Sequence, residues 1–162
     1  MAPLFTANWF NFGRNPGGSA GSAAQSITGG TKTTFGSYTV HTFTSPGSFA
    51  ISGGSPFNID YLCVGGGGGG GARGAGGGAG GLRATVDQTG GGGSLESAVP
   101  VLAGGSYTIT VGAGGEGAVV PSGVPTGGNS GADSSLQYNG GTITAAGGGG
   151  GASDGSTSKP GG

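Results

Sequence analysis

The sequence predicts an all-β, partly irregular fold: short antiparallel β-strands and a hairpin lead into packed polyglycine II helices, with essentially no α-helix. Three observations predict it. Glycine supplies 47 of the 162 residues, far above the roughly 7% of ordinary proteins. Three strand-like segments each run directly into a glycine-rich stretch: Tyr61–Val64 into Gly65–Gly71, Tyr107–Val111 into Gly112–Gly115, and Ile143–Ala146 into Gly147–Gly151. No segment keeps the 3.6-residue period of an amphipathic helix free of Gly and Pro.

Glycine loses more conformational entropy on ordering than any other residue, so an ordered glycine run needs dense compensation. Extended polyglycine helices supply it, because their three residues per turn direct main-chain groups toward neighbours on all sides. Without Cβ atoms, such helices approach to backbone contact, where N–H···O and Cα–H···O bonds link them. The run from 65 to 81 is interrupted only by Ala72, Arg73, Ala75 and Ala79. We therefore expect a core made of backbone, with Arg73 at a turn or an edge.

The first 12 residues concentrate large apolar side chains more than any other part of the chain: Leu4, Phe5, Trp9, Phe10 and Phe12. Residues 13–30 are rich in Gly, Ser and Ala, which is typical of a tether. Either the apolar residues fold back onto the domain, or they dock onto another subunit. We favour an anchor on another subunit, because a tether follows. Residues 1–30 would then be an anchor and tether, and 31–162 the glycine-rich domain.

From Thr31 the pattern becomes β-like, and residues 31–64 should form a hairpin and a strand. The β-branched and aromatic segments Tyr38–Phe43 and Phe49–Ile51 flank a Ser-Pro-Gly turn signal. This arrangement predicts a hairpin over 37–52.

The segment Phe57–Val64 reads as the next strand, with Asp60 on the opposite face from Ile59 and Tyr61. Residues 65–162 would form a sandwich of polyglycine and β-structure. In it, 82–105 is a connection of mixed composition, and the Asn-Gly-Gly at 139–141 predicts a tight turn before the last strand.

Composition also bears on partners. Charged residues make up 7% of the chain and the net charge is −1, which leaves no electrostatic case for nucleic acid or acidic membrane. No apolar run reaches 18 residues, so we expect no membrane insertion. The first residues lack the features of a signal peptide, and we expect synthesis in a cytoplasm without export by that route.

The lone Cys63 cannot form an internal disulfide. We expect a small buried hydrophobe, with an intermolecular bridge or reactive thiol as the alternative.

The residues give little support for chemistry. The run Gly65–Gly71 matches a dinucleotide fingerprint only trivially, because no helix follows to receive a pyrophosphate. The only histidine, His41, lies mid-strand, so a nucleophile–base relay cannot be assembled. The six carboxylates are scattered singly. The stretch 127–136 loosely resembles calcium-binding repeats, but it is a single copy with the wrong spacing. We expect no enzyme activity, no cofactor and no metal.

Three blocks follow one another in a specific order between residues 36 and 151. The first holds Tyr38–Thr44, 47–49 and Asp60–Val64 with its glycine run; the second is 105–115; the third holds 128–136 and 142–147. This order resembles the glycine-rich domain of bacteriophage virion proteins, including the tip adhesins of T-even-like phages.

The resemblance implies a tail-fibre or adhesin component of a virion, made in the host cytoplasm, that binds the host cell surface through loops between polyglycine segments. It implies that other virion proteins hold the N-terminal segment, that a bacterial surface receptor is a partner, and that the chain forms a homo-oligomer, a trimer by family analogy. The candidate receptor contacts are Asp87, Gln88, Leu95, Glu96, Val119, Pro121, Val124 and Pro125.

Two alternatives remain open. The chain could be a structural virion component without receptor binding, such as a head fibre, a spike or a capsid decoration protein. Outside phages, it resembles ice-binding polyglycine bundles, although those proteins usually carry disulfides that this chain cannot form internally.

Overall fold

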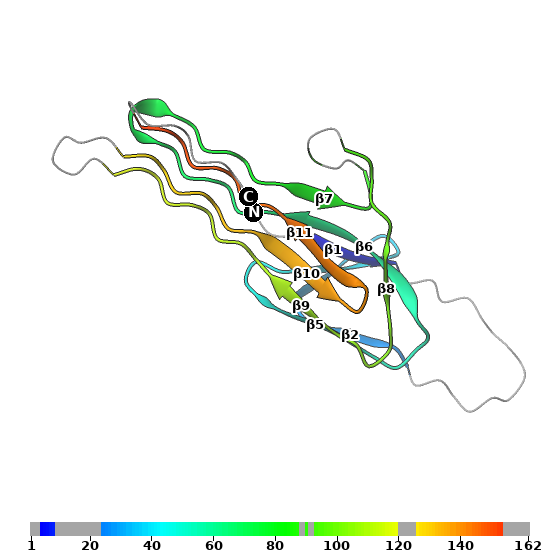
Figure 1. The fold of residues 1–162 in the computed structure, drawn as a ribbon. Coiled ribbons are helices and arrows are strands. Elements are labelled where there is room, and N and C mark those ends of the chain that lie inside the picture. Colours follow the sequence, from blue (N-terminus) through cyan, green and yellow to red (C-terminus); the bar gives the residue numbers. More distant parts are fainter. Residues whose placement is uncertain (1–3, 9–23, 88–89, 91–92, 120–125, 154–162) are drawn as a thin grey trace, which may run out of the picture.

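The computed structural model describes residues 4–8, 24–87, 90, 93–119 and 126–153. They form two antiparallel β-sheets, from which a bundle of extended glycine-rich segments projects (Figure 1). No α-helix is present among these residues, and the one 3₁₀ turn described in full is η1, Ala72–Gly74. The expected all-β fold is confirmed, and Arg73 lies in a turn as expected.

The first sheet has the strand order β3 (Thr31–Phe35), β4 (Tyr38–Thr42), β1 (Leu4–Asn8), β6 (Phe57–Val64) and β7 (Leu82–Ala84), with β8 (Val99–Val101) also paired to β6. The second has the order β11 (Gly141–Ala145), β10 (Ser134–Tyr138), β9 (Ser106–Thr110), β5 (Gly47–Ser52) and β2 (Ser26–Thr28). The predicted strand 57–64 and the predicted tight turn between β10 and β11 are both confirmed.

The hydrophobic core lies between the two sheets. Strand β6 shows how it is built: Ile59, Tyr61 and Cys63 are buried, whereas Asp60 is on the opposite, partly exposed face. This is the alternation of a strand with one face in a core. The other sheet contributes buried residues of β5, β9, β10 and β11: Phe49, Ile51, Tyr107, Ile109, Leu136, Ile143 and Ala145.

The predicted hairpin over 37–52 is wrong. Strand β4 pairs with β1 and β3 in the first sheet, whereas β5 pairs with β2 and β9 in the second. The Ser-Pro-Gly turn therefore carries the chain from one sheet to the other, so that both segments can turn apolar faces inward. His41 and Phe49 meet there edge to face, with ring centroids 5.4 Å apart. The actual hairpin is β3–β4, whose turn includes Gly36 at φ 58°.

Residues 1–30 contribute strands to both sheets. Strand β1 lies between β4 and β6, and its Leu4 is opposite Thr42 on one side and Leu62 on the other. Strand β2 pairs with β5. The backbones of Leu4 and Phe5 thus pair within the chain's own sheet. The other anchor candidates, Trp9, Phe10 and Phe12, lie outside the described residues.

Five extended segments continue the strands beyond the sheets (Figure 1). They are residues 65–71 after β6, 75–81 before β7, 112–118 after β9, 126–133 before β10, and 146–152 after β11. They lie side by side and are joined by backbone hydrogen bonds.

The hydrogen bonds repeat every three residues, which is the period of polyglycine II. The amides of Gly65, Gly68 and Gly71 donate to the carbonyls of Gly81, Gly78 and Ala75, at 2.9, 2.8 and 2.7 Å. The amides of Gly66 and Gly69 donate to Ala132 and Asn129 of another segment.

Segment 65–71 is central, because it also accepts hydrogen bonds from the two remaining segments. The amides of Gly115 and Ala118 donate to the carbonyls of Gly67 and Gly70. Those of Gly148 and Gly151 donate to the carbonyls of Gly66 and Gly69. The bundle interior is therefore main chain bonded to main chain.

This packing requires glycine where segments touch. A Cβ on Gly68 would overlap the carbonyl oxygen of Gly149, and one on Gly115 would overlap that of Asn129. Backbone atoms cannot move aside without breaking the bonds that they make, so no larger residue fits at either position.

Candidate functional site

The predicted contact residues belong to two connections, and the described parts of these connections lie apart (Figure 1). The connection 119–125 joins segments 112–118 and 126–133, whose ends lie at the far end of the bundle, and Thr126 is bonded there to Ala72 of η1. The connection between β7 and β8 lies beside the sheets.

At the far end of the bundle, Val119 has 67% of its surface exposed. The ends of this connection are fixed, since the hydroxyl of Thr126 donates to the carbonyl of Val119 at 2.7 Å. The amide of Ala72 donates to the carbonyl of Thr126 at 3.1 Å. The candidates Pro121, Val124 and Pro125 lie outside the described residues.

In the connection between β7 and β8, Asp87 is exposed and has a left-handed φ of 67°. The side chain of Leu95 is 49% exposed, and that of Val86, which the sequence did not single out, is 45% exposed. The candidate Gln88 lies outside the described residues.

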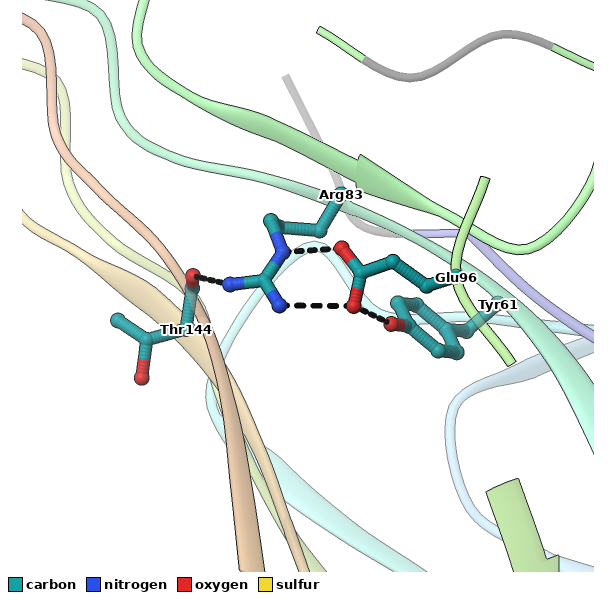
Figure 2. Close-up of polar contacts among 4 residues, drawn as sticks. All are labelled: Tyr61, Arg83, Glu96 and Thr144. Atoms are coloured by element: carbon teal, nitrogen blue, oxygen red, sulfur yellow. Dashed lines mark hydrogen bonds and ion pairs between the residues drawn. The ribbon is translucent and has the colours of Figure 1, made fainter. Parts of the chain in front are cut away.

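Glu96 differs from its neighbours because both oxygens of its carboxylate accept hydrogen bonds (Figure 2). Nε and Nη2 of Arg83 donate to its two oxygens, the second at 2.7 Å, and the hydroxyl of Tyr61 donates to Oε2 at 2.5 Å. Nη1 of Arg83 donates to the carbonyl of Thr144 at 3.0 Å. The cluster therefore joins β6, β7 and the connection to β8 with β11 of the second sheet.

The electrostatics of the cluster follow from these contacts. The hydrogen bonds from Arg83, and then from Tyr61, hold the pKa of Glu96 below its usual range, against the opposing effect of burial. The same bond raises the pKa of Arg83. Burial, followed by the hydrogen bond to the Glu96 carboxylate, raises the pKa of Tyr61 above its usual value. At neutral pH the cluster is an ion pair with a neutral phenol.

Glu96 thus makes structural contacts in this fold, and these contacts also restrain the adjacent residue Leu95. Its amide donates to the carbonyl of Ala84 at 3.0 Å, so backbone and side chain are both tied down. Leu95 is therefore held next to a fixed residue while its own side chain remains exposed. No local sequence pattern indicates this cluster, because Tyr61 and Glu96 are 35 residues apart.

An open pocket of about 480 Å³ lies next to the cluster, between β7 and β11 where the sheets pass into the bundle. Its lining is mostly main chain and small side chains: Gly80, Gly81, Leu82, Arg83, Gly90, Thr144, Ala145 and Ala146. Arg83 is the one charged residue in this lining.

Cys63 is fully buried, as expected for a small hydrophobe, and burial raises the pKa of its thiol to about 11. His41 is also buried, and its Nδ1 lies 2.7 Å from the carbonyl of Gly29.

Within the described part of the chain, no group of three or more His, Cys, Asp or Glu side chains could hold a metal ion. No helix in this part is long and apolar enough to cross a membrane.

A β-sandwich continued by backbone-packed glycine segments defines a glycine-rich β-domain. Comparison with protein families agrees: the model of the "Glycine-rich domain" family matches residues 42–162, and the chain belongs to this family. Strands β1, β2 and β3 precede the matched region. No curated protein and no solved structure matches the chain.

Proposed function

We propose that this chain is a fibre protein of a bacteriophage virion, a tail-fibre or adhesin component that binds the host cell surface through loops between its polyglycine segments. The observation that carries the proposal is the exposed Val119 at the end of segment 112–118, where Thr126 bonds it and is itself bonded to Ala72 of η1. The resemblance of the three sequence blocks to phage virion domains supports the same conclusion.

The physical support for a binding role is that a rigid scaffold carries exposed residues in its loops. Binding residues are concentrated on loops that a rigid framework positions. The bundle provides such a framework, because every segment is bonded to its neighbours through the main chain. Exposed apolar side chains such as Val119 and Leu95 supply contact area for a surface molecule.

The test measures binding of the purified full-length chain to susceptible bacteria. We expect Val119→Asp or Leu95→Asp to weaken binding, because each places a charge in a contact loop. Leu102→Asp is the matched control, since Leu102 is 44% exposed but belongs to neither candidate loop. Wild-type protein that binds no susceptible cell would overturn the proposal.

For assembly, we propose that the N-terminal segment attaches the chain to other virion proteins and that the chain forms a homo-oligomer. Because Leu4 and Phe5 pair within the first sheet, the anchor would rely mainly on Trp9, Phe10 and Phe12. Replacing these three aromatic residues with Ser should prevent incorporation into particles while the isolated chain still folds. Normal incorporation of that variant would contradict the anchor.

The second candidate is a structural virion component, such as a head fibre or decoration protein. The backbone-bonded bundle favours it, because segments joined to one another by main-chain hydrogen bonds would serve as a rigid spike. This role predicts many copies per particle and unchanged adsorption when residues 31–162 are deleted. Counting copies in intact particles separates it from the adhesin role.

A further inference from the structure

One face of the polyglycine bundle contains glycines that the fold of a single chain does not require. A Cβ on Gly76 would have no atom within 4 Å. A Cβ on Gly114 would meet its nearest atom at 3.6 Å, and a Cβ on Gly117 at 3.8 Å. None of the three has a positive φ, so any residue could adopt their conformation. All three are exposed. Glycine there costs conformational entropy without an intrachain reason.

These glycines lie in one layer of the bundle. A Cβ on Gly114 would point to within 3.6 Å of the carbonyl of Gly67, and one on Gly117 to within 3.8 Å of that of Gly70. On the other side of the central segment, a Cβ on Gly67 would lie 3.7 Å from the carbonyl of Ala79. Segments 75–81, 65–71 and 112–118 thus form a row, whose open side we call the glycine face: Gly67, Gly70, Gly76, Ala79, Gly114 and Gly117.

The main-chain hydrogen bonds of the central segment within the described part of the chain are a second, independent observation. Five amides of this segment, those of residues 65, 66, 68, 69 and 71, donate to neighbouring segments. Among the described residues, the amides of Gly67 and Gly70 have no such acceptor. Both residues are at least partly exposed. In a polyglycine II lattice each helix bonds to neighbours on all sides, so the lattice that the described residues form is unfinished on this side.

We propose that the glycine face packs against the glycine face of a second copy of this chain. An extended main chain with a three-residue repeat and no side chains is the surface that matches it, and the face of another copy provides that surface. Segments inside the bundle already pack antiparallel, as 65–71 does with 75–81. A two-fold axis across the face would reproduce this contact between copies. No charged residue lies on the face, so two copies would not repel each other there.

This contact joins two copies, unlike the trimer that the phage resemblance implies, and it does not depend on receptor binding. The mass of the full-length chain in solution, measured by light scattering after gel filtration, should therefore be that of a pair. Gly117→Asp places a charge at the face, where a Cβ fits, and should weaken pairing roughly 30-fold or more, the effect of losing an interface hot spot. The melting temperature of the isolated chain should stay close to that of the wild type.

The matched control is Ala113→Asp, in the same segment but off the face, which should leave pairing unchanged. If Gly117→Asp unfolds the chain, Gly114→Ser provides a smaller change at the same face, with the same expected loss of pairing. A wild-type chain that stays monomeric at high concentration, or a folded Gly117→Asp variant that still pairs, would overturn the proposal. So would pairing that appears only after residues 154–162 are deleted, since the chain's own end would then occupy the face.

Discussion

Tyr61 and Glu96 are joined by a 2.5 Å hydrogen bond, although they lie 35 residues apart and on different elements. Arg83 holds the same carboxylate and also reaches Thr144 of the second sheet. One acidic side chain therefore links the connection between β7 and β8 to both sheets. The chain has only six acidic residues. Most of the described structure is held together by main-chain hydrogen bonds and apolar contacts, whereas this cluster acts through charged side chains.

Replacement of Glu96 by Gln should reduce stability in a pH-dependent way. The folded pKa of Glu96 is lowered, so its contribution is present above the unfolded pKa of about 4.3 and is lost as the pH falls through the folded pKa. We expect Glu96→Gln to lower the free energy of unfolding by about 1 kcal/mol at pH 7. Chemical denaturation at several pH values measures it.

The difference between wild type and Glu96→Gln should shrink as the pH falls below about 4. The control is Glu116→Gln, because Glu116 is an exposed residue of segment 112–118. A difference between wild type and Glu96→Gln that stays constant from pH 7 to pH 3 would show that the carboxylate's charge does not matter.

The thiol of Cys63 should be inert in the folded protein. It is fully buried and its pKa is raised to about 11, whereas a thiol in the unfolded chain titrates near about 8.5. A thiol reagent at pH 8 should therefore label the chain only after denaturation. Because the unfolded state loses its proton first, stability should also decline as the pH rises above about 8.5. Rapid labelling under native conditions would show that the strand opens locally.

Deletion of residues 1–8 should destabilise the domain. Strand β1 pairs with β4 along Leu4–Asn8 and with β6 along Leu4–Ala7, so its loss separates the β3–β4 hairpin from the rest of its sheet. We expect the melting temperature to fall by about 5 °C or more, measured by circular dichroism. An unchanged melting temperature would mean that this segment serves only to attach the chain elsewhere.

The sequence predicted what depends on local pattern. The strand 57–64 follows from alternation around Asp60, and the packed glycine runs follow from the missing side chains of Gly65–Gly71. It did not predict which sheet a strand joins: β4 and β5 flank a good turn signal, yet they belong to different sheets. Which sheet a strand joins depends on long-range packing, such as the contact between His41 and Phe49 in the interior.

The candidate site was only partly predictable for the same reason. The exposure of Val119 and Leu95 follows from their place in glycine- and proline-rich connections. The engagement of Glu96 depends on the register that brings Arg83 and Tyr61 beside it, and no local pattern encodes that register. The glycine face is likewise invisible in the sequence, because Gly114 and Gly115 differ only in which neighbour each one faces.

The central claim, a bundle interior made of backbone, is tested most directly by comparing Gly115→Ala with Gly114→Ala at low protein concentration, where contacts between copies do not contribute. We expect the two substitutions to have opposite effects on the free energy of unfolding. Gly115→Ala should destabilise by about 3 kcal/mol or more, because its methyl group meets the carbonyl of Asn129. Gly114→Ala should stabilise by about 0.4–1 kcal/mol, because the methyl group fits and the unfolded chain loses freedom. Equal effects of the two substitutions would contradict the account.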